Sequence, residues 1–267
     1  MMTPAERYRA TMEMKSVDRL VRQEFGFMEG TLDSWKKQGL NGSDINDVFN
    51  FDRDLGRVTL GNLGWCEPAF MPLYEDRLLR TEGDYDIVQD IAGRTVRFFK
   101  GRRNNFMPTY LKHAVANRED WEKDVLPRLN PETPERLAAY DREVERVVGV
   151  VKEKGSWLQQ RLIGPYMYLR ALMGPEDVMY AFYDVPDLIH DILNAWVTLS
   201  DRMISRLQAK IEIDEIFFGE DICYKNGLLI SPDTWREFLK PHYLDLIARI
   251  QSRQKKQLQI QTQLEIF

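Results

Sequence analysis

Six side chains that could bind or transform a ligand follow a short apolar run, residues 216–218, and Gly219. The next helix has a clear start, because Ser231 offers a capping oxygen and Pro232 suits the first helical position. A polar loop between a strand and a helix lies at the carboxyl end of the strand, where α/β proteins bind ligands. The loop is therefore a candidate site, and the alternative is a solvated loop with a lysine–carboxylate pair. Its polar residues are Glu220, Asp221, Cys223, Tyr224, Lys225 and Asn226.

Strand and helix signals alternate along much of the chain. A helix start at Thr133 and Pro134 is followed by apolar residues at helical spacing, which is typical of a helix with one face packed on a sheet. Strands and helices in regular succession favour a parallel sheet. We predict strands at residues 20–25, 157–163, 213–218 and 258–262, and helices at residues 31–38 and from residues 133, 175, 186 and 231.

The pattern changes between residues 57 and 112. Segments there alternate between apolar and polar residues and are separated by turns. Residues 87–91 and 95–99 flank a turn that contains Gly93, which is typical of a β-hairpin. We predict a β-hairpin insertion over residues 57–112, within a single domain that comprises residues 1–267.

Length and composition limit the class of protein. The 267 residues, 43% of them hydrophobic, suffice for one large core, and a βα barrel of about 250 residues fits this length. Thirty-seven basic against 42 acidic residues give a formal charge of −5, which offers no general attraction to nucleic acid or to an anionic membrane. Cys66 and Cys223, without a secretory leader, indicate a reducing compartment. We expect a cytoplasmic protein with no membrane-spanning segment.

Three segments carry a resemblance to a known family. The longest is Glu-Asp-Ile-Cys-Tyr-Lys-Asn-Gly at residues 220–227, with Leu-Ile-Ser-Pro and Phe-Leu-Lys-Pro-His-Tyr after it. Val-Asp-Arg at residues 17–19 and Arg-Gln-Glu-Phe-Gly at residues 22–26 lie near the start, and Leu-Ile-Gly-Pro-Tyr at residues 162–166 lies in the middle. Together they resemble the uroporphyrinogen decarboxylase superfamily, which also contains corrinoid-dependent methyltransferases, and most of all its methyltransferase-like branch.

The resemblance implies a (β/α)8 barrel of the TIM type, in which each βα unit needs roughly 30 residues. Little sequence follows the predicted strand at residues 258–262. We therefore expect an incomplete barrel, truncated after about residue 262, in which residues 263–267 are not the native continuation. A parallel strand without its neighbour exposes unpaired backbone groups, so we also expect self-association through an exposed barrel edge.

The resemblance also implies a pocket at the carboxyl-terminal face of the barrel, for a tetrapyrrole, a corrinoid or a small methyl donor. Asp221 and Lys225 are its candidate catalytic residues. Arg22 and Gln23 match the first half of the motif with which decarboxylases hold substrate carboxylates, but Gly26 stands in place of the second arginine. A surface ion pair with a neighbouring carboxylate is the alternative role for this arginine. The other candidate ligand-binding residues are Tyr168, Arg170, Glu220 and Tyr224.

Methyltransferases of this superfamily bind zinc through a His-x-Cys pair on the strand after the Ser-Pro helix, and here that strand reads Gln-Ile-Gln-Thr at residues 259–262. We expect no metal site, and we expect any corrinoid to be carried by a partner protein. Three alternatives stay open: methyl transfer, uroporphyrinogen decarboxylation, and a catalytically silent remnant or binding protein. No Walker, Gly-x-Gly-x-x-Gly, Gly-x-Ser-x-Gly or His-Glu-x-x-His sequence occurs, which argues against nucleotide-dependent, serine-hydrolase and zincin classes.

Overall fold

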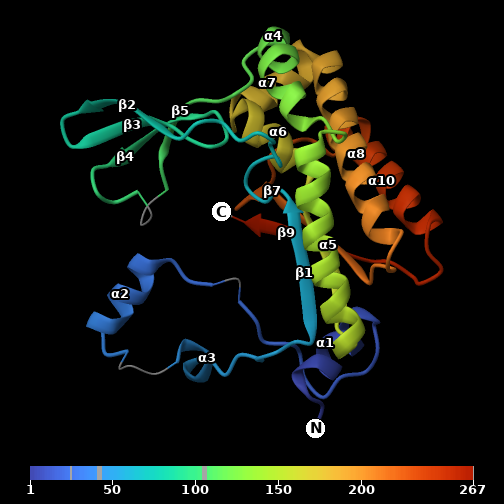
Figure 1. Ribbon diagram of the computed structural model, residues 1–267. Helices are drawn as coiled ribbons and strands as arrows, with labels where there is room; N and C mark the ends of the chain where they lie inside the picture. Colours follow the sequence, from blue (N-terminus) through green and yellow to red (C-terminus); the bar gives the residue numbers. More distant parts are fainter. Residues whose placement is uncertain (25, 41–43, 104–106, 267) are drawn as a thin grey trace.

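The centre of the fold is an open parallel sheet. The structure, a computed structural model, describes residues 1–24, 26–40, 44–103 and 107–266 (Figure 1). Within these residues the prediction of a mixed α/β protein with a parallel sheet is confirmed, but the sheet is not closed into a barrel. A short strand, β8 (Gly227–Leu228), folds back on the end of the third parallel strand. In spatial order the four parallel strands are β1 (Arg57–Leu63), β6 (Trp157–Ile163), β7 (Glu215–Tyr224) and β9 (Gln259–Ile266).

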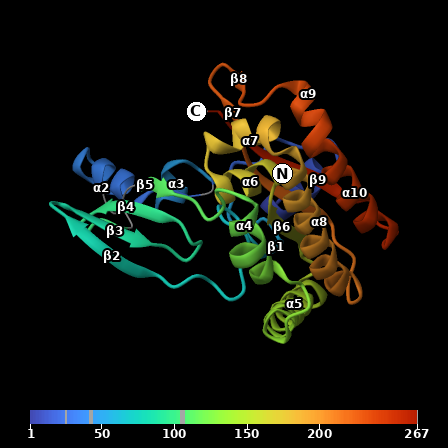
Figure 2. The same ribbon diagram turned by 90° about the horizontal axis from the view of Figure 1, so that it is seen from above.

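Three long helices pack against one face of this sheet (Figures 1 and 2). They are α5 (Pro134–Lys154), α8 (Pro186–Gln208) and α10 (Lys240–Ser252). Trp196 of α8 donates a hydrogen bond from Nε1 to the carbonyl oxygen of Ile163 at 2.9 Å. Tyr243 of α10 meets the ring of Phe218 on β7 edge-on, with centroids 5.0 Å apart. The main hydrophobic core therefore lies between these helices and the sheet.

Local capping signals set the starts of two helices. The N-terminal helix, α1 (Pro4–Met12), begins at a capping box formed by Thr3 and Glu6. The hydroxyl group of Ser231 accepts from the backbone N–H of Thr234 at 3.0 Å, as the sequence predicts. From there α9 (Pro232–Thr234) continues through a π-helical turn, Trp235–Leu239, into α10.

The remaining helices are short. Two of them, α6 and α7, lie between β6 and α8, and the others precede β1 or α5. None of the helices in the described part of the chain is long and apolar enough to cross a membrane. The short helices are α2 (Glu29–Lys37), α3 (Ile45–Val48), α4 (Arg118–Asp120), α6 (Pro165–Met173) and α7 (Asp177–Asp184), and the turns after α4 are a π-helical turn (Trp121–Val125) and a 3-10 turn (Leu126–Leu129).

A second sheet stands to one side of the helices α8 and α10 (Figures 1 and 2). Its four antiparallel strands are β2 (Arg77–Glu82), β3 (Tyr85–Gln89), β4 (Thr95–Phe99) and β5 (Thr109–Lys112). The predicted hairpin is confirmed, because β3 and β4 pair across the turn at Gly93. The predicted start of the insertion at residue 57 is wrong, since β1 belongs to the parallel sheet and pairs with β6, about 100 residues later in the sequence.

Two other local predictions are corrected. Strand β7 does not stop at Gly219 but continues to Tyr224, so the predicted acidic loop is the end of a strand and a hairpin turn. The predicted strand at residues 20–25 is absent over residues 20–24, and residue 25 lies outside the described residues. No strand of the described chain pairs with this segment, and Leu20 is 76% exposed, so its apolar side chains gain little from an extended pairing.

Candidate functional site

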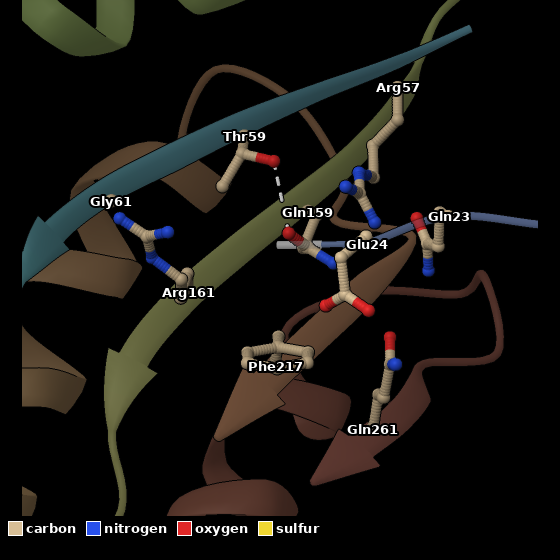
Figure 3. A pocket seen from close by; sticks show the side chains of 9 residues that line it. All are labelled: Gln23, Glu24, Arg57, Thr59, Gly61, Gln159, Arg161, Phe217 and Gln261. Carbon is tan, nitrogen blue, oxygen red and sulfur yellow. Dashed lines mark hydrogen bonds between the residues drawn. The ribbon is translucent and has the colours of Figure 1, made fainter. Parts of the chain in front are cut away.

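The second face of the parallel sheet is polar. A parallel strand covered on both faces is usually an apolar run. Strand β6 instead carries Gln159 and Arg161 in its middle, and both point away from the long helices. They line a cavity of about 430 Å³ together with side chains from the neighbouring strands and from the segment before α2 (Figure 3). The lining residues are Gln23, Glu24, Arg57, Thr59, Gly61, Gln159, Arg161, Phe217 and Gln261.

Two arginines from adjacent strands supply positive charge to this cavity. The guanidinium group of Arg57 donates to the hydroxyl group of Tyr8 at 3.1 Å and lies over that ring, 5.1 Å from its centroid. The guanidinium group of Arg161 lies 4.8 Å from the ring centroid of Trp65, and its Nε is buried without a hydrogen-bond partner in the described chain. Within the described residues neither arginine has a carboxylate at ion-pair distance. Glu215 is linked to Arg57 through the Tyr8 hydroxyl, and Glu24 lines the same cavity, so the guanidinium groups can bind a ligand only beside these carboxylates.

Close packing fixes the position of Arg161. A Cβ atom on Gly61 would lie 2.8 Å from Nη2 of Arg161, so the guanidinium group rests directly against the backbone of β1. Trp65, which covers the other side of the group, stacks on Phe217 of β7 with ring centroids 5.8 Å apart. A guanidinium held between a backbone and an indole loses little further freedom when it binds an anion.

Glu215 is a buried carboxylate that fixes several side chains near the end of the cavity where the parallel strands begin. Glu215 is 0% exposed, and it accepts hydrogen bonds from Tyr8 at 2.7 Å, from Trp157 Nε1 at 2.9 Å and from Gln159 Nε2 at 2.7 Å. The oxygen of the Gln159 amide accepts from Thr59 at 3.0 Å, which sets the orientation of that amide. Burial, and then the charge of Glu215, raises the pKa of the Tyr8 hydroxyl, so it remains a donor.

Two polar atoms of the cavity wall have no hydrogen-bond partner among the described residues, and the second of them belongs to Gln261. Gln261 comes from β9, and its Oε1 is buried without a hydrogen bond among the described residues. Buried polar atoms in native proteins nearly always have a partner, which is another protein group, ordered water or a ligand. The carbonyl oxygen of Gln261 and the Nε of Arg161 are therefore one acceptor and one donor that a ligand or water would satisfy.

The predicted acidic residues lie at the carboxyl end of β7, and Glu220 faces the helices. Its carboxylate accepts from the backbone N–H groups of Tyr166 at 3.1 Å and Met167 at 2.8 Å, which open α6, and it bonds to the hydroxyl group of Tyr243. Burial raises the pKa of Glu220 to about 7, although these hydrogen bonds lower it. A side chain at Gly164 would overlap the carboxyl group.

Asp221 and Arg170 form an ion pair, with Nη1 and Oδ2 2.6 Å apart and side chains that are 20% and 27% exposed. The pair joins the carboxyl end of β7 to α6, next to the carboxyl group of Glu220. The structure therefore brings together three of the predicted residues, Glu220, Asp221 and Arg170. A partly exposed ion pair can hold α6 in position or bind a ligand. The geometry of this pair fits both roles.

The other predicted residues are dispersed. Gln23 lines the polar cavity, whereas the side chain of Arg22 is exposed. The backbone of Arg22 bonds to Asp52: its N–H donates to the Asp52 carboxylate at 2.9 Å, and its carbonyl oxygen accepts from the Asp52 N–H at 2.8 Å. Tyr224 and Lys225 are exposed at the hairpin turn, with the ammonium nitrogen 5.8 Å from the tyrosine ring centroid. The eight predicted residues therefore do not form one pocket.

Tyr168, which was predicted to line a pocket, lies in the main core and is not among the residues that line the polar cavity. Its side chain is 1% exposed within the main core, where burial raises the pKa of its hydroxyl group, and that hydroxyl has no hydrogen-bond partner among the described residues. The helical geometry of α6 explains this position, because successive residues of a helix point to different sides.

Sequence reasoning missed the polar face of the sheet. The available signal was in the strand that begins at Trp157, where glutamines and an arginine interrupt an apolar run. The predicted insertion includes Arg57 and Thr59, so the sequence analysis does not place them beside Gln159. The alternation of side chains on β1, with Arg57, Thr59 and Gly61 on one face, is consistent with a sheet whose second face lines a cavity.

Within the described residues, no group of three or more histidine, cysteine, aspartate or glutamate side chains could hold a metal ion. The residues present therefore do not fit the zinc site of the methyltransferases that the sequence resembles.

Comparisons with known proteins give distant similarities to solved structures. Solved structures that match include a methyltransferase from Methanosarcina mazei, with 16% sequence identity and a TM-score of 0.48, over 100% of this chain and 70% of the other. A scan against protein-family models and a search of curated proteins both found no match.

Proposed function

We propose that the polar face of the central sheet binds a small anionic molecule. The observation that carries the proposal is the pair Arg57 and Arg161, which face one cavity from adjacent strands without an ion-pair partner among the described residues. Guanidinium groups bind carboxylates and phosphates through parallel N–H bonds, and these bonds are stronger where water is partly excluded. The amides of Gln159 and Gln261 add neutral hydrogen-bonding groups that would orient the ligand.

We further propose that the open parallel sheet corresponds to part of the barrel of the uroporphyrinogen decarboxylase superfamily, closest to its methyltransferase-like branch, and that the polar face corresponds to the inside of that barrel. The resembling segments support this proposal by their positions. Residues 162–166 span the end of β6 and the start of α6, and residues 220–227 span the end of β7 and its hairpin. Both lie at the carboxyl ends of parallel strands, where barrel enzymes place their binding loops.

The volume of the cavity is sufficient for the smallest of the predicted ligand classes. Its volume of about 430 Å³ lies in the lower part of the range of about 300–1,000 Å³ that is usual for small-molecule sites. A small methyl donor or a single-ring acid fits within this volume, and the open side of the cavity leaves room for a larger ligand. In this proposal a corrinoid, where one takes part, is supplied by a partner protein.

Asp221 is the proposed catalytic carboxylate, because it is partly exposed and held by Arg170 at the carboxyl end of β7. Lys225 lies exposed on the hairpin turn and has no contact that supports a catalytic role. No step is assigned to zinc, because the described residues do not fit it.

Nuclear magnetic resonance titration of the 267-residue chain with propionate, and with neutral propionamide, tests the proposed anion site. Propionate should shift the side-chain Nε–H signals of Arg57 and Arg161, and propionamide should not. In Arg161→Gln, propionate should shift the signal of Arg57 alone, whereas Arg236→Gln, at an exposed ion pair with Asp233, should leave both shifts unchanged. Equal shifts with acid and amide, or no shift with either, would refute the proposal.

Uroporphyrinogen decarboxylation is the second candidate, because two free guanidinium groups could hold substrate carboxylates. Incubation of the protein with uroporphyrinogen, followed by chromatography of the oxidised porphyrins, should show stepwise loss of acetate carboxyl groups for a decarboxylase. Unchanged uroporphyrinogen would exclude this candidate and leave the small anionic ligand.

A further inference from the structure

We propose that the ligand of this cavity is an elongated molecule with an acidic group at each end, one held by Arg57 and the other by Arg161. This inference rests on the proposed anion site and adds the shape and charge pattern of the ligand.

Arg57 and Arg161 lie at different levels along the strands of the sheet. Arg57 pairs in register with Trp157, so Arg161 lies four residues further toward the carboxyl ends of the strands. At ~3.3 Å per residue, this separates the two levels by roughly 13 Å. The contact of Nη2 of Arg161 with the backbone at Gly61 places its guanidinium group at that upper level. This distance separates the backbone levels of the two arginines, and Figure 3 shows their guanidinium groups on opposite sides of the hydrogen-bonded pair Thr59 and Gln159. We therefore assign a separate acidic group of the ligand to each arginine.

The part of the cavity wall that lies between the two arginines is uncharged. Thr59 and Gln159 hydrogen-bond to each other there, and Gly61 contributes no side chain. Phe217 adds an apolar surface on the next strand. Such a wall suits the neutral middle of a ligand. Glu24 projects into the same region from the opposite side, so a third acidic group in the middle of the ligand would meet a like charge.

Neither arginine is held by direct contact with a carboxylate of the described residues. Arg57 is held by the Tyr8 hydroxyl, which in turn donates to Glu215, and Arg161 is held by the Trp65 ring. A guanidinium group has five N–H donors, of which a hydroxyl contact uses one and stacking on a ring uses none. Both groups therefore keep donors and positive charge for an acid at either end of a ligand.

Calorimetric titration of the 267-residue protein with succinate, adipate, suberate and sebacate tests this inference, with octanoate as the monoacid control for suberate. Affinity should increase from succinate to the longer diacids, and suberate should bind at least about tenfold more tightly than octanoate, since one charge-assisted contact separates them. Arg57→Gln and Arg161→Gln should each reduce suberate binding to the level of octanoate. Arg236→Gln is the surface control, because its partner Asp233 is 93% exposed.

The outcomes separate this inference from the proposed function. Equal binding of suberate and octanoate, or loss of suberate binding on substitution of one arginine only, overturns the two-ended ligand while the anion site stands. If none of the diacids and monoacids binds and propionate shifts neither arginine signal, both the two-ended ligand and the anion site are wrong. The ligand series on the unaltered protein decides between these outcomes even where an arginine variant does not fold.

Discussion

Replacement of Glu220 by glutamine should change how the stability of the protein depends on pH. The carboxyl group is 3% exposed, and it meets the amino terminus of α6 and the hydroxyl group of Tyr243. Burial is the largest influence on its pKa and raises it from the ordinary value of 4.5 to about 7. Glutamine keeps the size of the side chain but does not titrate.

The sign and size of the effect follow from this raised pKa. Because the folded protein holds the proton more tightly than the unfolded chain, the stabilisation from the protonated carboxyl group is complete below about pH 4.5 and is lost as pH rises toward 7. A pKa shift from 4.5 to about 7 corresponds to about 3 kcal/mol, at ~1.4 kcal/mol per pKa unit. The Glu220→Gln variant should not lose this stabilisation as pH rises. It should also be less stable than the wild type at low pH, because its amide N–H₂ cannot accept from the N–H groups of α6.

Urea unfolding of both proteins from pH 4.5 to pH 8 measures the effect. The difference in unfolding free energy between wild type and Glu220→Gln should shrink by about 3 kcal/mol over this range. Glu237→Gln, at an exposed position of the π-helical turn before α10, is the matched control and should follow the wild type. A difference that stays constant with pH, or one that grows as pH rises, would refute the reasoning about burial.

Three further substitutions, and one control substitution, test other contacts by urea unfolding. Gly164→Ala adds a methyl group that overlaps the buried carboxyl group next to α6 and should cost about 1–3 kcal/mol, whereas Gly149→Ala, on an open side of α5, should stabilise by about 0.5–1 kcal/mol. Tyr8→Phe removes a hydrogen bond to the buried Glu215 and should cost about 1–3 kcal/mol. Asp221→Asn breaks a partly exposed ion pair and should cost less than about 1 kcal/mol.

A different result would contradict each of these predictions. Equal effects of the two glycine substitutions would mean that the structure has room beside the carboxyl group of Glu220. A Tyr8→Phe variant as stable as the wild type would show that the hydrogen bonds of Glu215 do not depend on this hydroxyl. A loss well above 1 kcal/mol for Asp221→Asn would indicate a pair shielded from water more than its side-chain exposures of 20% and 27% imply.

Local signals in the sequence were sufficient for several elements. The helix from Pro134, the strand Trp157–Ile163, the hairpin around Gly93 and the capped helix start at Ser231 all agree with the structure. Caps, turns and hydrophobic periodicity act over a few residues, so the neighbouring sequence alone specifies them.

Tertiary structure alone decided which polar residues meet. The sequence fully determines the types and order of the residues at positions 57, 161 and 261, but only pairing between distant strands places them around one cavity. Glu220 and Asp221 are adjacent in the sequence, yet one is buried against α6 and the other is partly exposed beside Arg170. The reason is that a strand sends successive side chains to opposite faces, and what covers each face depends on segments far away along the chain.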